Sequence, residues 1–412
     1  MINSAKRRAT NPSRIVAALA AATVLLAGCA GGGGGGGAGS KTTTLKFQEI
    51  FAPGEAFADA SKAYGDAVTE ATGGTVTFEY FWSNSVAPTD EVAAAMNDGL
   101  LDMGRIQPPA SPADYPIINW LSSASNLNTA SFPAGLLQKV GAHLELFLNS
   151  QDLEQELGKL GIRYIAPLAL VQQYDLLCKK PVTSLADLKG RKIRTAGQAW
   201  VDEAKNLGAQ PVTLLPEEIY EGYQRGIVDC VMTYPTHYIN SGLWELGGYY
   251  VPLQLNGWNQ DGLTISKAAW DKLDENQRRE MYRAVRTWLE SFISTQIRAY
   301  WRFATEAPQH GVTLGQPLAE VQTVIDRHHE EVLAKLPTTA PKGVSDPGGL
   351  LDRYADLHDK WLGIVKDLGF DTEGQGLQSF LDSLDDPTKP PAIDLDPWLD
   401  KVMAEAFGEK LG

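Results

Sequence analysis

The sequence predicts a two-lobed α/β protein with a ligand cleft between the lobes and a long bridging helix. Three observations predict it: a helix–glycine–strand unit that occurs twice, alternating strand and helix patterns around the first copy, and one apolar-striped stretch of about 30 residues. At 412 residues the chain also exceeds what one hydrophobic core usually serves.

The repeated unit is the strongest of these observations. Residues 90–103 read DEVAAAMNDGLLDM and residues 217–230 read EEIYEGYQRGIVDC, which match class for class. Each copy opens with two acidic residues, which are favourable at a helix N-terminus. Each then reaches a glycine, Gly99 or Gly226, suited to the position after a helix, and continues as a short aliphatic strand. The two copies are best explained as equivalent pieces of two α/β lobes.

The segments around the first copy follow the same scheme. The patterns predict a strand over 45–50, a helix over 56–72 and a strand over 75–81. Alternating strands and helices form open sheets, and ligands bind at the carboxyl ends of such strands. We therefore expect the binding site in a cleft between the two lobes.

A single helix is predicted from about Glu275 to Thr305, with apolar residues on two adjoining stripes and Asp274 as its cap. At 1.5 Å per residue it would be roughly 45 Å long, so we expect it to run across both lobes. We assign lobe I to 42–166 plus about 254–284, and lobe II to 167–253 plus about 285–336 with the bridging helix. A C-terminal extension, 337–412, contains a helix near 350–368 and an acidic, proline-broken tail that either covers a lobe or mediates association.

The N-terminus has the pattern of an exported lipoprotein. Four basic residues precede an uncharged run over 15–27, which is typical of a signal peptide and too short to span a bilayer. The residues Leu26-Ala27-Gly28-Cys29 resemble the bacterial lipobox, which implies a signal peptide over 1–28 and a lipid on Cys29. The Gly-rich residues that follow, up to residue 41, form a flexible tether. We therefore expect the protein to be lipid-anchored in the cell envelope, outside the cytoplasm.

The protein is acidic, and this limits the classes of partner that it can bind. Removing the four basic residues of the leader from the chain's 36 leaves 32 against 50 acidic residues, a net charge of −18. This disfavours nucleic acid as a partner, and any anion site must be built around a locally placed cation. Cys178 and Cys230 either form a disulfide or are two buried thiols, and the sequence does not decide between these.

One stretch resembles a known family. It comprises VTSLADLKGRKIR over 182–194, then Leu207-Gly208-Ala209, Pro211-Val212, Glu218-Ile219-Tyr220 and Gly226-Ile227-Val228-Asp229. In order and spacing these are similar to the solute-binding proteins of tripartite ATP-independent periplasmic (TRAP) transporters, also called DctP-like. The resemblance implies a periplasmic-binding-protein-like fold that closes over an organic acid or similar solute, with a TRAP membrane permease as partner.

The resemblance also implies that Arg194 binds the ligand carboxylate. A guanidinium suits this role because its rigid fork of donors meets a carboxylate in two parallel hydrogen bonds. The sequence departs from the family where many members place an acid after the "VD" pair, because Cys230, Val231 and Met232 stand here. A metal-bridged ligand is therefore not expected.

Further lining residues are expected at the strand ends of both lobes, where pocket walls form. The candidates are Phe51, Gln107, Tyr174, Tyr234, Trp258 and Asn259. For each of these, packing in the core is as plausible as ligand contact, because aromatic residues fill cores as readily as they line pockets.

No catalytic or phosphate-binding motif of the G-x-S-x-G, H-E-x-x-H or P-loop type occurs. The pair His328 and His329 points in directions about 100° apart on a helix, so a solvated helix face is expected there in place of a metal site. We expect no enzyme activity, no cofactor and no metal. Two alternatives stay open: the binding protein of an ATP-driven importer, which the neighbouring genes would distinguish, and an envelope hydrolase using paired carboxylates.

Overall fold

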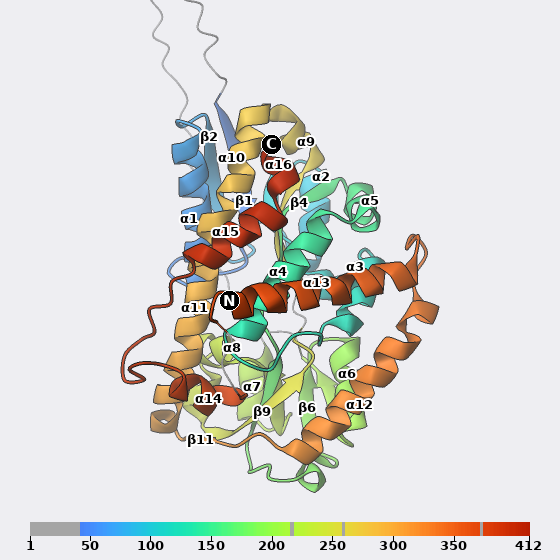
Figure 1. The fold of residues 1–412 in the computed structure, drawn as a ribbon, viewed down its shortest axis with the longest axis vertical. Coiled ribbons are helices and arrows are strands. Elements are labelled where there is room, and N and C mark those ends of the chain that lie inside the picture. Colours follow the sequence, from blue (N-terminus) through green and yellow to red (C-terminus); the bar gives the residue numbers. More distant parts are fainter. Residues whose placement is uncertain (1–41, 215–217, 258–259, 371–373) are drawn as a thin grey trace, which may run out of the picture. The chain divides into compact units, whose positions relative to one another are not determined.

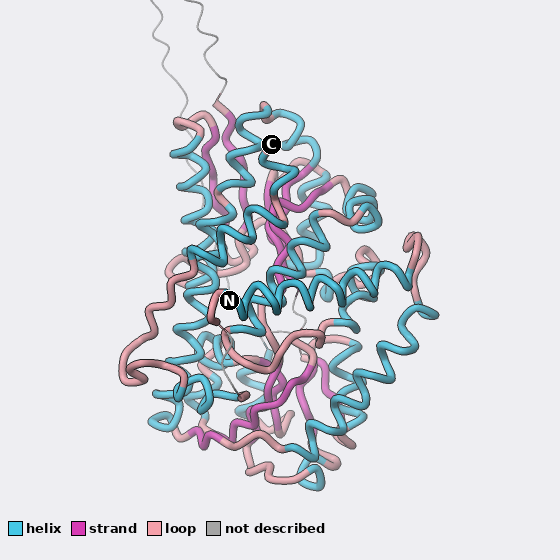
Figure 2. The backbone as a smooth tube through the Cα atoms, in the orientation of Figure 1, coloured by secondary structure: helices cyan, strands magenta, loops and turns pink. Residues whose placement is uncertain are grey.

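The computed structural model describes residues 42–214, 218–257, 260–370 and 374–412. In these ranges the strands form two separate mixed sheets covered by helices (Figures 1 and 2). The first sheet has the order β2-β1-β3-β10-β4 and the second β11-β9-β5-β8-β6-β7. Two sheets of this kind give the two-lobed α/β fold that the sequence predicts.

The first sheet belongs to lobe I. Its strands are β1 (Thr43–Gln48), β2 (Val76–Phe81), β3 (Met103–Arg105), β4 (Ile162–Ala169) and β10 (Gln260–Ser266). The helices of this lobe are α1 (Ala56–Ala71), α2 (Val92–Asn97), α3 (Pro116–Leu121), α4 (Ala134–Leu148), α5 (Gln151–Lys159), α9 (Lys267–Lys272) and α10 (Glu275–Arg283). Strands β1, β2 and β3 are parallel, whereas β10 runs antiparallel to both β3 and β4.

The second sheet belongs to lobe II. Its strands are β5 (Tyr174–Cys178), β6 (Lys192–Thr195), β7 (Gln210–Thr213), β8 (Cys230–Thr233), β9 (Gly248–Leu255) and β11 (Val312–Leu314). The helices of this lobe are α6 (Gln198–Asn206), α7 (Ile219–Gln224), α8 (Pro235–Asn240) and α12 (Ala319–Lys335). Strands β6, β7 and β8 are parallel, and β5 runs antiparallel to β8 and β9.

The predicted repeat is confirmed, and the structure explains its aspartates. Helices α2 and α7 each end before a glycine with positive φ, Gly99 at 76° and Gly226 at 77°. Asp102 then accepts the backbone N–H of Lys46 at 3.0 Å, and Asp229 accepts that of Lys192 at 2.9 Å. Each aspartate thus ties the start of its strand to the neighbouring parallel strand, β1 in lobe I and β6 in lobe II. This correspondence pairs Gln48 on β1 with Arg194 on β6.

The predicted bridging helix is wrong in one detail, because it is divided in two. Helix α10 ends at Arg283, and α11 (Val285–Glu306) begins after Ala284. The expected cap is confirmed, since Asp274 and Gln277 form a reciprocal capping box at the start of α10. Helix α11 packs against both lobes: Phe292 stacks on Phe57 of α1 at 5.4 Å, and Gln296 accepts a hydrogen bond from the hydroxyl of Thr236 on α8.

Two short connections join the carboxyl edges of the sheets. Four residues, 170–173, lead from the end of β4 to the start of β5, and residues 256–259 lead from the end of β9 to the start of β10. Strands β4 and β9 end, and strands β5 and β10 begin, at the carboxyl edges of their sheets. The carboxyl edge is the edge at which the parallel strands of a sheet end. A connection of this length spans at most about 18 Å. The two carboxyl edges are therefore held near each other.

The C-terminal extension packs on both lobes. Helix α13 (Pro347–Asp367) lies along α4, while α15 (Asp396–Glu405) contacts α4 and α11, as Figure 1 shows. Helix α16 (Gly408–Leu411) contacts α10, and α14 (Gly376–Asp382) contacts α11 and β9. Trp361 and Trp398 are fully buried in these contacts. The extension is thus part of the hydrophobic core. In the described part of the chain, no helix is long and apolar enough to cross a membrane.

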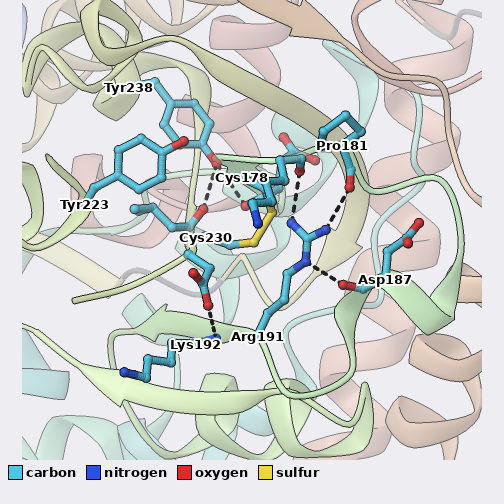
Figure 3. Close-up of a disulfide and its surroundings, with 12 residues drawn as sticks. Cys178, Pro181, Asp187, Arg191, Lys192, Tyr223, Cys230 and Tyr238 are labelled. Carbon is cyan, nitrogen blue, oxygen red and sulfur yellow. Dashed lines mark hydrogen bonds between the residues drawn. A yellow bond between two sulfur atoms is a disulfide. The ribbon is translucent and has the colours of Figure 1, made fainter. Parts of the chain in front are cut away.

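Cys178 and Cys230 form a disulfide between directly opposed residues of β5 and β8 (Figure 3). Both are fully buried. Arg191 lies close by and closes the adjacent loop, because its guanidinium donates to the carbonyls of Lys180 at 3.0 Å and Pro181 at 2.8 Å. A buried disulfide is typical of proteins that fold outside the cytoplasm.

Candidate functional site

Arg194 is a buried cation near the carboxyl end of β6. Its side chain is about 5% exposed. The guanidinium donates to the carbonyl of Leu214 through Nε at 3.2 Å and through one terminal nitrogen at 3.1 Å, and more weakly to that of Met232 at 3.4 Å. Among the described residues no carboxylate forms an ion pair with it. Carbonyl oxygens satisfy donors but bring no counter-charge, so burial lowers the pKa of Arg194.

Aromatic residues lie near this guanidinium. Tyr174 at the start of β5 lies between Trp200 of α6, with ring centroids 5.5 Å apart, and Tyr234 after β8, 5.6 Å away. The planes of both pairs are within 30° of parallel. Tyr174 and Tyr234 are close enough to Arg194 to act on its charge. The structure thus brings together three residues that the sequence proposed separately, Arg194, Tyr174 and Tyr234.

His237 completes the group on the side of lobe II. It lies on α8, and its Nδ1 is 3.1 Å from the hydroxyl of Thr233. Burial, assisted by the positive charge of Arg194, lowers the pKa of His237 to about 3, so its imidazole is neutral at physiological pH. It adds a polar group without adding a second positive charge.

The sequence analysis missed Trp200 and His237. Both lie on helices that begin directly after the carboxyl ends of strands, α6 after β6 and α8 after β8. Because such helices start at the ligand edge of an α/β sheet, their first turns were the places to search. Trp200 is the third residue of α6 and His237 the third of α8.

The carboxyl edge of lobe I carries an arginine that is already paired with carboxylates. Arg105 at the end of β3 is buried between two carboxylates, with Glu49 at 2.9 Å and Asp261 bound through two hydrogen bonds. All three side chains are at most 1% exposed. The two carboxylates raise the pKa of Arg105 despite its burial. This cluster satisfies its own cation, and its formal charges sum to −1, while burial raises the pKa of Glu49.

The remaining candidates of lobe I lie near this cluster. Phe51 is half-buried, and its ring centroid is 5.2 Å from the guanidinium carbon of Arg105. Gln107 is half-buried two residues after Arg105. Trp258 and Asn259 lie outside the described residues. Phe51 and Gln107 therefore belong to the carboxyl edge of lobe I, whereas Arg194 and its rings belong to that of lobe II.

Arg194 does not line either of two cavities found in the described residues. One of about 280 Å³ is lined by Lys179, Tyr223 and Gly248 among others. It sits where β5 ends and β9 begins, at the opposite end of the strands from Tyr174. A second of about 40 Å³ is lined by polar side chains, including Asn126, Gln172 and His329, and has room for about one water molecule. Arg194 is therefore a candidate site because of its chemistry, and the cavities do not mark it.

The environment of His329 differs from the solvated helix face that the sequence predicts. It is not on a solvated face, because its Nε2 is 2.7 Å from Glu203 and 2.9 Å from the amide of Asn126. Helix α12 is held by these contacts against α6 on one side and the segment after α3 on the other. Within the described ranges no three histidine, cysteine or acidic side chains gather as metal ligands would.

The sequence is similar to known solute-binding proteins. Residues 47–332 match the model of the DctP family, bacterial extracellular solute-binding protein family 7. A solute-binding protein of Roseobacter denitrificans is 26% identical over 247 residues, which cover 59% of this chain and 72% of that protein.

Two solved structures are similar in fold. A TRAP solute-binding protein from a marine metagenome, solved with pyroglutamate, has a TM-score of 0.63 at 18% identity and covers 77% of this chain and 99% of its own. A TRAP periplasmic solute-binding protein of Desulfovibrio desulfuricans, solved with sn-glycerol-3-phosphate, has a TM-score of 0.64 at 14% identity and covers 77% and 97%. With more than half of its length matched by the family model, this chain belongs to the DctP-like family of TRAP solute-binding proteins, which are extracytoplasmic receptors.

Proposed function

We propose that this protein is a lipid-anchored TRAP receptor that captures a small carboxylate-bearing solute between its lobes and delivers it to a membrane permease. Arg194 is the main anchor of the solute. The observation that carries the proposal is the buried guanidinium of Arg194, which contacts carbonyl groups but no carboxylate of the described residues.

Burial without a counter-charge is costly, and a ligand carboxylate would offset that cost. Removing a charge from water is unfavourable by several kcal/mol unless an opposite charge compensates it. The three described contacts leave two of the five guanidinium N–H groups for a ligand. Two parallel donors would orient a carboxylate as well as neutralise it. The anionic ligands of the two similar structures support the same class of solute.

The anchor is proposed from Cys29, which lies outside the described residues. The lipobox-like Leu26-Ala27-Gly28-Cys29 and the Gly-rich segment after it support a lipid on the cysteine sulfur and a tether to the folded body. Cys29→Ser should abolish labelling by a fatty-acid probe in cells. If the Cys29→Ser protein is labelled as strongly as the wild type, the anchor is elsewhere.

The ligand class is tested by screening and calorimetry. In a thermal-shift screen of organic acids, amino acids and sugar acids, the ligand should raise the melting temperature of the protein. A ligand at 100 times its Kd stabilises the native state by about 2.7 kcal/mol. Arg194→Ala should then weaken binding by roughly 30-fold to several thousand-fold, since it leaves a buried carboxylate unpaired. Arg194→Lys should retain only part of the affinity, because lysine keeps the positive charge but lacks the two parallel donors of the guanidinium.

A surface arginine provides the control. Arg225 is 68% exposed and pairs only with Glu221 one helical turn away, so Arg225→Ala removes the same charge without touching the site. It should bind like the wild type. If Arg194→Ala binds within threefold of the wild type, Arg194 is not the anchor and the proposal fails.

A further inference from the structure

We infer that the site selects flat-ring monocarboxylates over dicarboxylates and over acids with puckered or open chains, with Tyr174, Trp200 and Tyr234 as the residues that determine this preference. The inference rests on the proposed function, because it takes Arg194 as the anchor. It goes beyond it by assigning both the charge and the shape of the solute.

The charge follows from the groups at the two carboxyl edges. Lobe II presents Arg194, while His237 beside it is neutral. Lobe I presents Arg105, which is already held by Glu49 and Asp261. The lobe I counterpart of Arg194 is Gln48, an amide whose oxygen accepts the N–H groups of Val86 and Ala87.

A second acidic group on the solute would therefore lack a cation. Among the described residues of both edges, Arg194 is the one cation that no carboxylate neutralises. Another buried cation, Lys139 of α4, reaches the connection between the two edges, where its Nζ binds the carbonyl of Gln172 at 3.0 Å, and burial lowers its pKa to about 7, so it is only partly charged at neutral pH. A solute carboxylate or phosphate facing lobe I would meet the net negative charge of the Arg105 cluster. Arg194 therefore compensates one negative charge on the solute, whereas a second negative charge is repelled by the Arg105 cluster.

The shape follows from the rings around Arg194. The three rings form a series in which Trp200 and Tyr234 each stack on Tyr174, with centroid separations of 5.5 and 5.6 Å and interplanar angles of 20° and 30°. These separations are those of offset-stacked aromatic pairs. A flat ring attached to a carboxylate at Arg194 can extend this series face to face. A puckered ring of the same size presents axial hydrogens and cannot approach as closely.

Core packing alone would also place three rings together, and it makes a different prediction. If the rings only fill space, replacing one with an aliphatic side chain weakens all acids alike. If they stack on the solute, the same replacement weakens flat acids selectively. The ratio of two affinities therefore distinguishes a specificity role from a structural one.

The test uses three probes on the mature full-length protein, measured by calorimetry. Benzoate is flat with one charge, cyclohexanecarboxylate has the same number of carbons and the same charge in a puckered ring, and isophthalate is flat with two charges. We expect benzoate to bind about tenfold more tightly than cyclohexanecarboxylate, from the usual strength of ring stacking. We expect isophthalate to bind at least tenfold more weakly than benzoate.

Variants then assign the preference. Trp200→Leu and Tyr234→Leu should each reduce the benzoate-to-cyclohexanecarboxylate ratio to within about twofold of one, whereas Trp200→Phe should retain most of it. The control is Trp244→Leu, because Trp244 is buried in the same lobe but stacks on His310 and Phe303 near the start of β9, away from Arg194. Trp244→Leu should leave the ratio unchanged. Melting temperatures establish that each variant is folded.

The outcomes separate this inference from the proposed function. If Arg194→Ala abolishes binding of every acid but benzoate and cyclohexanecarboxylate bind alike, the preference is wrong and the carboxylate anchor stands. If Arg194→Ala changes nothing, the proposed function itself fails. A failure of benzoate to bind at millimolar concentration, or tighter binding of isophthalate, would also overturn the inference.

Discussion

The indole ring of Trp361 lies over Gly141, so closely that a Cβ at position 141 would overlap the ring. Trp361 belongs to α13 of the C-terminal extension and Gly141 to α4 of lobe I. The indole N–H also donates to Glu145, one turn along α4, at 2.9 Å. A helix outside the range matched by the family model therefore shares the core of lobe I.

This contact predicts the effect of one methyl group. Gly141→Ala should destabilise the protein by about 1–3 kcal/mol, because overpacking outweighs the roughly 1 kcal/mol that alanine contributes in a helix. In a Trp361→Ala background the same change should become neutral or stabilising. Urea unfolding of the four proteins of the cycle measures this. Gly363→Ala is the control on α13, since nothing lies within 4 Å of its Cβ position, and it should stabilise the protein. Additive effects of Gly141→Ala and Trp361→Ala would contradict the contact.

The disulfide should contribute substantially to stability. Cys178 and Cys230 are 52 residues apart, and closing a loop of this length is worth about 4 kcal/mol in the chain-entropy model. Replacing both with alanine should lower the free energy of unfolding by roughly this amount. Addition of dithiothreitol during unfolding should affect the wild type and leave the double variant unchanged. If both proteins respond equally to the reductant, the stabilisation has another source.

The sequence predicted the elements that depend on local patterns. Strands, helices and the two repeated units follow from periodicity and from Gly99 and Gly226, whose positive φ a glycine supplies at no steric cost. The capping box at Asp274 is equally local. The division at Ala284 was missed, because the apolar stripes of 275–305 continue through it.

Part of the candidate site could be proposed from the sequence, because some of its residues follow local patterns. Arg194 came from a resemblance, and Tyr174 and Tyr234 from their places at strand ends. Which residues join them depends on contacts between segments far apart in sequence, such as Trp200 with Tyr174. Arg105 is paired with Glu49 and Asp261, which lie 56 and 156 positions away in the sequence. No local pattern predicts these pairs.

Asp175 should make stability depend on pH. Burial raises the pKa of this carboxyl to about 7, although Leu253 N–H and the hydroxyl of Tyr250 both donate to it. A carboxyl with a raised pKa binds a proton in the native state that the unfolded chain releases, so its contribution to stability falls as the pH rises from about 4 to about 7. The loss attributable to this group is about 4 kcal/mol at most, since one pKa unit corresponds to 1.36 kcal/mol.

Comparison with Asp175→Asn isolates this group. The amide has a similar shape but does not titrate, so its free energy of unfolding should fall less than that of the wild type between pH 4 and pH 7. Guanidinium unfolding at several pH values measures both profiles. Parallel profiles would show that Asp175 does not titrate in this window.

Ligand binding should compact the protein. The chain passes between the two sheets through two short connections and α11, so the lobes can rotate toward each other while each sheet remains intact. Arg194 and its rings lie on one edge and Phe51 and Gln107 on the other, so a solute held by both must draw them together. Small-angle scattering of the mature protein with saturating ligand should give a smaller radius of gyration than without it. Arg194→Ala at the same ligand concentration should not compact, which excludes a solvent effect of the acid. An unchanged radius in the wild type, despite binding shown by calorimetry, would mean that the site is rigid and that the edges already stand at their ligand-bound separation.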